Sequence, residues 1–114
     1  MREKKIMTIN FSANSPEAAI ALINESGIAT TSADLALIEE ANSGAFRDGY
    51  ANGVNVEMGD GKSVDFESYA VVEELIKNLS FSSTVVLSSE IVEAIREMLD
   101  LSFSGGSSEG AWDC

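Results

Sequence analysis

The sequence predicts an α+β fold: one small domain with a mixed sheet of three to four strands, a β-hairpin at about residues 53–67 and about four helices. Alternating apolar and polar residues, typical of half-buried strands, occur near the start of the chain and again in its middle. Between and after them lie segments with apolar residues at helical spacing, each preceded by a serine or threonine that can cap a helix. The 114 residues, 45% of them apolar, are enough for one core.

The first predicted strand covers residues 7–11, where apolar and polar residues alternate. The first helix is expected over residues 16–26. Ser15 is a favoured N-cap, Pro16 suits the first helical position, and Gly27 suits the residue just past the end.

A second, short helix is expected from Thr31 or Ser32 to near Gly44, with its apolar residues at helical spacing. Residues 45–52 lack a clear period and are interpreted as a loop or an irregular strand.

The sharpest pattern in the chain predicts the hairpin. Val54 and Val56 alternate with polar residues before Gly59-Asp60-Gly61, and Val64 and Phe66 do so after it. A three-residue turn with glycine in the left-handed conformation would pair the two runs.

A third helix of about 11 residues is expected to begin at a Ser68 cap. The β-branched run at residues 84–87 is interpreted as a buried strand. The last helix is expected to begin at Ser88 or Ser89 and to end near Leu101.

The predicted domain organisation has three parts. Residues 1–6 are expected to form a flexible N-terminus, residues 7–101 a single α+β domain, and residues 102–114 a glycine- and serine-rich tail without a helical pattern.

Composition excludes several classes of function. The 19 Asp and Glu residues outnumber the 7 Lys and Arg residues, giving a formal net charge of −12, so direct binding to nucleic acid is not expected. No apolar run approaches the ~20 residues of a membrane span. The only cysteine, Cys114, excludes an internal disulfide. The sequence therefore predicts a cytoplasmic protein that does not contact membranes.

The chain has few of the residue types and arrangements that act in catalysis. There is no histidine, and no carboxylate, lysine or cysteine stands in a recognisable catalytic arrangement. We therefore expect no enzymatic activity, no cofactor and no metal site.

The last helix carries a candidate binding surface. Glu90, Glu93, Glu97 and Asp100 are spaced three, four and three residues apart, so on a helix they share one ridge and repel one another. Such a ridge is either a solvated outer face or a surface that awaits a basic partner. The hypothesis is that the ridge, adjoined by Glu73 and Glu74 of the third helix, docks on a basic surface of a partner protein.

The charge and size of the chain are similar to those of small phage and mobile-element inhibitors, some of which imitate nucleic acid. This analogy implies an inhibitor or nucleic-acid mimic, and it rests on no shared motif.

The predicted tail offers further hypotheses. Trp112 is the only tryptophan. It either packs on the domain or on a neighbouring subunit, or it belongs to a short linear segment that a partner protein binds. A structural subunit locked into a homo-oligomer by this tail is therefore a second alternative function.

The first alternative function follows from Gly105-Gly106. A double glycine before a short segment with serines and a cysteine resembles the precursors of ribosomally made, modified peptides. That resemblance implies a leader at residues 1–106 and a core at residues 107–114, in which Ser107 or Ser108 could receive the Cys114 thiol as a thioether.

Overall fold

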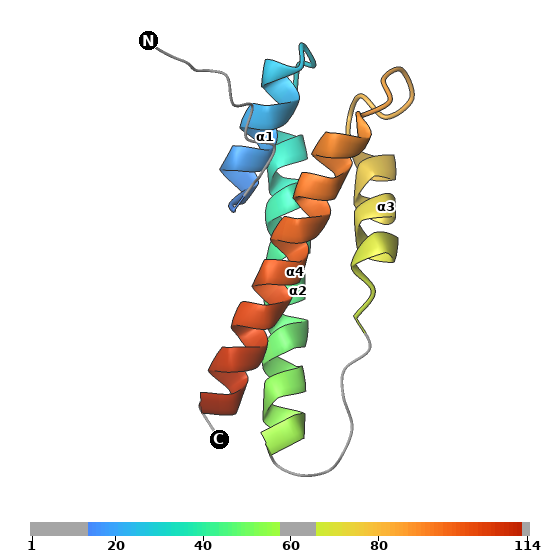
Figure 1. Ribbon diagram of the computed structural model, residues 1–114. Helices are drawn as coiled ribbons and strands as arrows, with labels where there is room; N and C mark the ends of the chain where they lie inside the picture. The colour runs from blue at the N-terminus through green and yellow to red at the C-terminus, as the bar shows by residue number, and fades with distance from the viewer. Residues whose placement is uncertain (1–13, 58–65, 113–114) are drawn as a thin grey trace.

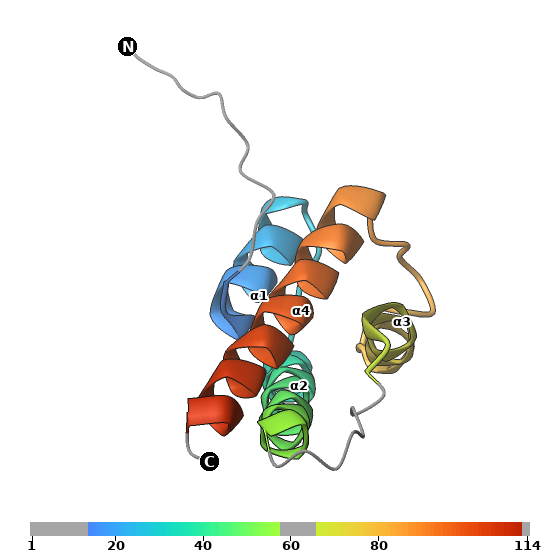
Figure 2. The same cartoon turned by 60° about the horizontal axis from the view of Figure 1, so that its bottom comes forward.

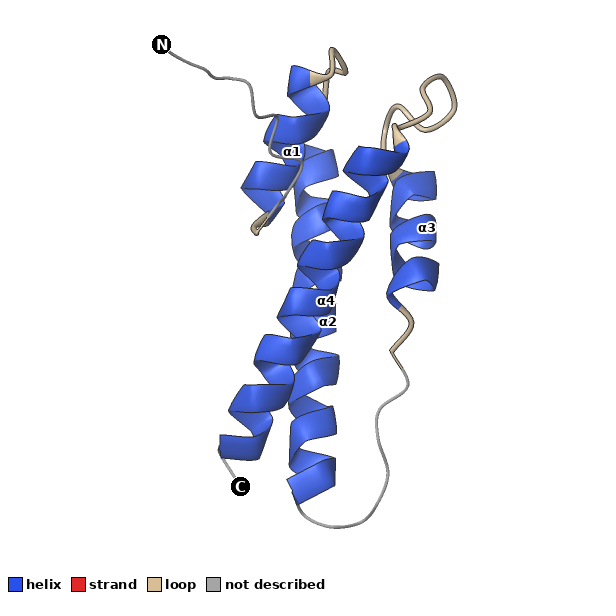
Figure 3. Ribbon diagram, in the orientation of Figure 1, coloured by secondary structure: helices blue, strands red, loops and turns tan. Residues whose placement is uncertain are grey.

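The computed structural model describes residues 14–57 and 66–112, and all the regular secondary structure in these two ranges is helical (Figure 3). The four helices are α1 (Pro16–Glu25), α2 (Ser32–Glu57), α3 (Ser68–Asn78) and α4 (Ser89–Trp112).

The two long helices form the axis of the molecule. α2 and α4 lie side by side along most of their length and run in the same direction (Figure 1). The short helices α1 and α3 pack on opposite sides of this pair, at the end where α2 and α4 begin (Figures 1 and 2). Beyond them, the second halves of α2 and α4 pack mainly on each other.

The capping residues of α1 act as the sequence predicts. The Ser15 side chain accepts a hydrogen bond from the Ala18 amide at 3.1 Å, and Pro16 is the first helical residue. Gly27 follows the helix with φ of +95°, a conformation that favours glycine. The predicted helix over residues 16–26 is confirmed to within one residue.

The start of α2 is fixed by reciprocal hydrogen bonds between Thr31 and Asp34. The Asp34 carboxylate accepts from the Thr31 amide at 2.9 Å, and the Thr31 hydroxyl accepts from the Asp34 amide at 3.3 Å. The same carboxylate accepts from the amide and the hydroxyl of Ser80, at 2.7 and 2.6 Å. Asp34, only 1% exposed, therefore joins α2 to the segment between α3 and α4.

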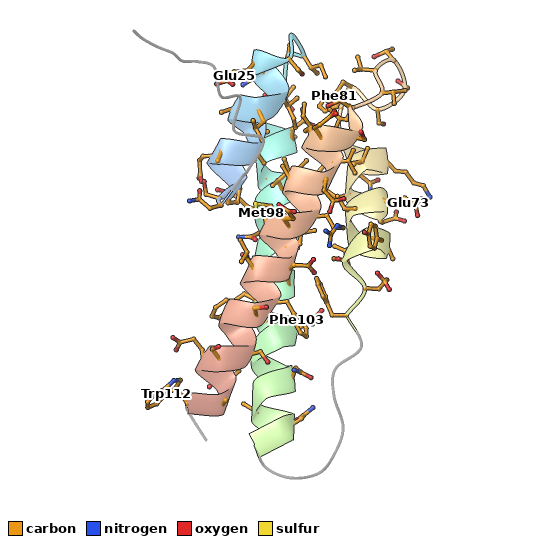
Figure 4. The ribbon with its side chains drawn as sticks, viewed as in Figure 1. Glu25, Glu73, Phe81, Met98, Phe103 and Trp112 are labelled. Carbon is orange, nitrogen blue, oxygen red and sulfur yellow. The ribbon has the colours of Figure 1, made fainter. Side chains whose placement is uncertain are left out.

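The apolar core lies where all four helices meet. Its most deeply buried large side chains come from α1, α2 and α4: Ile23, Ile38, Ile91, Ile95, Met98 and Leu99. Met98 lies on the side of α4 that faces α1, and Phe81 lies near the top of the view, in the segment that leads from α3 to α4 (Figure 4).

Four glycines bring the backbones of α2 and α4 together in the second halves of these helices. A Cβ at Gly49 would overlap the backbone of Phe103, and one at Gly53 would overlap that of Ser107. On the facing helix, a Cβ at Gly106 would lie 2.8 Å from the Tyr50 amide nitrogen, with Gly110 equally crowded. From each of these contacts to the next, the residue numbers on both helices increase by four, as expected for parallel helices.

Polar and aromatic contacts accompany this glycine interface. The Ser102 hydroxyl donates to the Asn42 side chain, and the Asn52 amide donates to the Ser107 hydroxyl at 3.0 Å. The rings of Phe103 and Phe66 stack with centroids 4.6 Å apart. This interface thus extends the contact between α2 and α4 past the main core.

The predicted α+β fold is wrong, because the described part of the chain contains helices and no strand. The predicted hairpin at 53–67 begins with the last turn of α2, whereas residues 58–65 lie outside the described residues. The alternation at Val54 and Val56 is typical of a strand, but both residues are helical. Their helix shows no apolar period because the face of α2 that meets α4 uses glycine in place of large apolar residues.

Other boundaries also differ from the predictions. Residues 45–52, interpreted as a loop or an irregular strand, continue α2, and residues 84–87, interpreted as a strand, are a turn and irregular backbone. The last helix begins at Ser89 as predicted but runs on to Trp112 instead of ending near Leu101. Glu67, and not Ser68, caps α3. The strand predicted at 7–11 lies outside the described residues.

Candidate protein-binding surfaces

The acidic ridge of α4 is partly neutralised from within. Arg96 donates to Glu93 at 2.7 Å through its Nε atom and also pairs with Asp100. Its guanidinium carbon lies 4.7 Å from the centre of the Tyr69 ring, a cation–π contact with α3. Two of the four predicted ridge residues, Glu93 and Asp100, thus hold the Arg96 side chain in place where α3 meets α4.

These contacts shift the pKa of both charged groups in the direction that favours the charged form. The hydrogen bond from Arg96 lowers the pKa of the Glu93 carboxyl, and the Coulombic attraction of Arg96 adds to this effect. The same hydrogen bond raises the pKa of Arg96. Because the Glu93 carboxylate already forms an ion pair with Arg96, Glu93 is a poor candidate for contact with a partner.

The other two residues of the ridge are available to a partner. Glu90 and Glu97 are exposed, and no ion pair within the described part of the chain holds either of them. With Glu93 they border a shallow hollow of about 400 Å³ on the surface of α4. The unneutralised negative charge of the ridge is concentrated at this hollow.

A larger, apolar groove lies between α3 and α4. Its volume is about 550 Å³, and its apolar lining comes from Ala70, Val72 and Ile76 of α3 and Val92 of α4. Two exposed glutamates, Glu67 and Glu73, and the exposed cation Lys77 also line it, together with Tyr69. Figure 4 shows Glu73 pointing away from the body of the molecule.

A second apolar groove lies on the other side of α3, against α2. It measures about 410 Å³ and is lined by Leu37, Ala41, Val71 and Leu75, with Glu40 and Glu74 among its polar residues. Glu73 and Glu74 therefore serve different grooves, because adjacent helical residues point about 100° apart. The sequence hypothesis placed them on one surface, which the structure does not support.

Trp112 lies far from all of these acids. It occupies the last described turn of α4 and points outward, 86% exposed (Figure 4). The proposed binding residues thus divide among an acidic face on α4, two grooves beside α3 and a tryptophan in the last turn of α4.

Sequence reasoning missed the apolar residues of both grooves and overlooked the role of Arg96. The spacing of Arg96, three residues after Glu93 and four before Asp100, was the available signal for the ion pairs. The grooves depend on how far α3 stands from its neighbours, which the sequence pattern of one helix does not reveal.

The described residues contain neither a cluster of metal-binding side chains nor a helix suited to cross a membrane. No group of three or more acidic, histidine or cysteine side chains in residues 14–57 and 66–112 is arranged to hold a metal ion. No helix in these ranges combines the length and apolar character needed to cross a membrane.

Comparison of the chain with protein-family models, with curated proteins and with solved structures finds no match.

Proposed function

We propose that the protein is a non-enzymatic binding module that docks on a basic surface of a partner protein. The observation that carries this proposal is the apolar groove between α3 and α4, bordered by Glu67 and Glu73. An apolar floor with charged residues at its edge suits an amphipathic segment, whose apolar side chains fill the groove while its Lys or Arg side chains meet the glutamates.

Electrostatics outside the groove support the same partner. The net charge of −12 attracts a basic protein from a distance and speeds association at low salt. Glu90 and Glu97 add negative charge on α4, the helix that contributes Val92 to the groove. In this proposal, the groove provides the apolar contact and the acids orient the partner.

The test is an NMR titration of the full chain with a synthetic amphipathic peptide whose polar face carries lysines. Saturable shifts are expected at Val72, Ile76 and Val92, the groove residues. Glu73→Lys should weaken binding at least about tenfold, since it places a like charge against the peptide. Glu39→Lys is the matched control, because it makes the same charge change at an exposed site outside the groove.

Two outcomes would reject the proposal. One is the absence of saturable shifts in the groove. The other is equal weakening by Glu73→Lys and Glu39→Lys, which would indicate that net charge alone attracts the peptide. Glu93→Lys is unsuitable as a test, because it would remove an ion pair with Arg96 and so perturb the contact between α3 and α4.

The precursor hypothesis receives less support. Gly105 and Gly106 lie inside α4, and Gly106 is buried against the backbone of α2. A protease that cleaves after Gly106 would require this part of α4 to unwind first. The mass of the intact protein from its host tests the idea, since a core released after Gly106 leaves a truncated chain.

A further inference from the structure

An exposed stripe runs along the second half of α4. It consists of Leu101, Gly105, Ser108 and Trp112, which are spaced four, three and four residues apart and therefore share one face of the helix. The two large residues are 63% and 86% exposed. Along the stripe, the large side chain of Leu101 is followed by the small residues Gly105 and Ser108 and then by the large side chain of Trp112. The order of side-chain sizes is therefore the same in either direction.

No other described helix covers the stripe. α1 and α3 pack along the first half of α4, and only α2 accompanies its second half (Figure 1). Phe46 of α2 flanks the stripe: a Cβ at Gly105 would lie 3.9 Å from its ring, which is itself 40% exposed. Three large apolar side chains thus remain in contact with water at this end of the molecule.

The same end carries little of the net charge. Residues 44–57 and 101–112, the second halves of α2 and α4, contain one Arg, one Asp and two Glu, a net charge of −2, whereas residues 14–43 and 66–100 carry −10. Like-charged copies of the protein therefore repel each other least when they meet at this end. A second copy of the chain is the occupant that this apolar, weakly charged stripe fits best.

We propose that two copies of the chain associate through this stripe, with their α4 helices antiparallel about a two-fold axis. In this register Trp112 of each copy lies over Leu101 of the partner subunit, and the small residues Gly105 and Ser108 face each other at the centre. Because a two-fold axis uses the same stripe on both copies, the two contacts between Trp112 and Leu101 are equivalent.

The dimer is expected to be weak. The 12 residues from 101 to 112 span only about 18 Å of helix. One such helical face, even with Phe46 beside it, falls short of the roughly 1,200–2,000 Å² that stable interfaces bury. Association should therefore depend on concentration, and this inference is independent of the proposal that the α3/α4 groove binds a basic partner.

The test combines sedimentation of the full chain with fluorescence of its only tryptophan, both over a range of concentrations. Reducing buffer prevents a disulfide between two copies of Cys114. The expected result is a reversible monomer–dimer equilibrium in which Trp112 emission shifts to shorter wavelength as the dimer forms, because the ring leaves water.

Three variants locate the interface. Trp112→Ser and Leu101→Ser should each raise the dimer dissociation constant at least about tenfold. Leu101→Ser should also abolish the wavelength shift although it retains the tryptophan, because the antiparallel register places Leu101 of one copy on Trp112 of the other. Val86→Ser is the control, since Val86 is 94% exposed but lies before α4, outside the stripe.

A protein that stays monomeric up to about 1 mM would overturn the inference, since this concentration covers even weak association. Equal weakening by Val86→Ser would overturn it as well, and a full wavelength shift in Leu101→Ser would reject the antiparallel register. Circular dichroism of each variant establishes that the helices are intact before its association is compared.

Discussion

Replacing Gly106 with alanine tests the backbone contact between α2 and α4. The added Cβ would lie 2.8 Å from the Tyr50 nitrogen and 2.9 Å from the Phe46 carbonyl carbon, with the Phe46 oxygen closer still. These are backbone atoms, which cannot rotate aside as a flexible side chain can. The helices must therefore separate, and a gap of 0.5–1 Å already forfeits about a quarter to a half of the attraction between facing atoms.

The net effect follows from two opposing contributions. Overpacking costs up to about 3 kcal/mol, and alanine recovers about 1 kcal/mol through its higher helix propensity. We expect Gly106→Ala to lower the free energy of unfolding by about 2 kcal/mol, which for a chain of this size corresponds to a fall in Tm of roughly 8 °C.

Gly105 offers a matched control one residue earlier on α4. A Cβ there would make an ordinary contact of 3.9 Å with the Phe46 ring. Gly105→Ala should therefore gain the helix propensity without the clash, about 0.5–1 kcal/mol. Thermal and urea unfolding, followed by circular dichroism, measure both variants. Equal effects of the two substitutions on Tm would refute the close contact.

Two further predictions concern other contacts. Asp34→Asn should lower the free energy of unfolding at neutral pH by about 1.5–3 kcal/mol, the contribution of hydrogen bonds to a charged group. Burial alone raises the pKa of Asp34, but the hydrogen bonds from Ser80 and Thr31 outweigh it and lower the pKa. Its stabilisation is therefore complete above the ordinary Asp pKa of about 3.9 and is lost as the pH falls through the lower, folded value. Urea unfolding between about pH 7 and pH 2 checks this, and a variant with an unchanged acid profile would contradict it. For the stacked rings, a double-mutant cycle of Phe66→Leu and Phe103→Leu should give a coupling of about 0.5–1.5 kcal/mol, and additive effects would show that the stack contributes nothing.

Local signals in the sequence predicted the starts of the helices well. The pair Ser15 and Pro16 marked the beginning of α1, and the serines at 88 and 89 marked that of α4. These signals depend on hydrogen bonds within a few residues, so they can be recognised without knowledge of the rest of the fold.

The ends of the long helices could not be predicted from apolar periodicity. From Ala45 of α2 and from Ser102 of α4 onward, the residues that face the other helix are largely small, and a search for large apolar side chains finds no helix there. The available signal was glycine repeated at a spacing of four, at 49 and 53 and again at 106 and 110. Such spacing places two glycines on one helical face and lets another backbone approach.

The candidate site was only partly accessible to sequence reasoning. The acids Glu90 and Glu97 are exposed as the ridge hypothesis requires, but Glu93 and Asp100 are paired with Arg96. The apolar groove between α3 and α4 depends on the packing of two helices, so no local pattern could have revealed it.

Residues 102–112 are a helix packed on α2 and not an irregular tail. NMR of the isotopically labelled full chain tests this helix and its packing directly. The expected result is helical Cα chemical shifts throughout residues 102–112, together with strong cross-peaks between the Hα protons of Gly106 and the amide proton of Tyr50. Random-coil shifts over these residues, without cross-peaks to α2, would contradict the glycine interface and the dimer stripe that depends on the same stretch of helix.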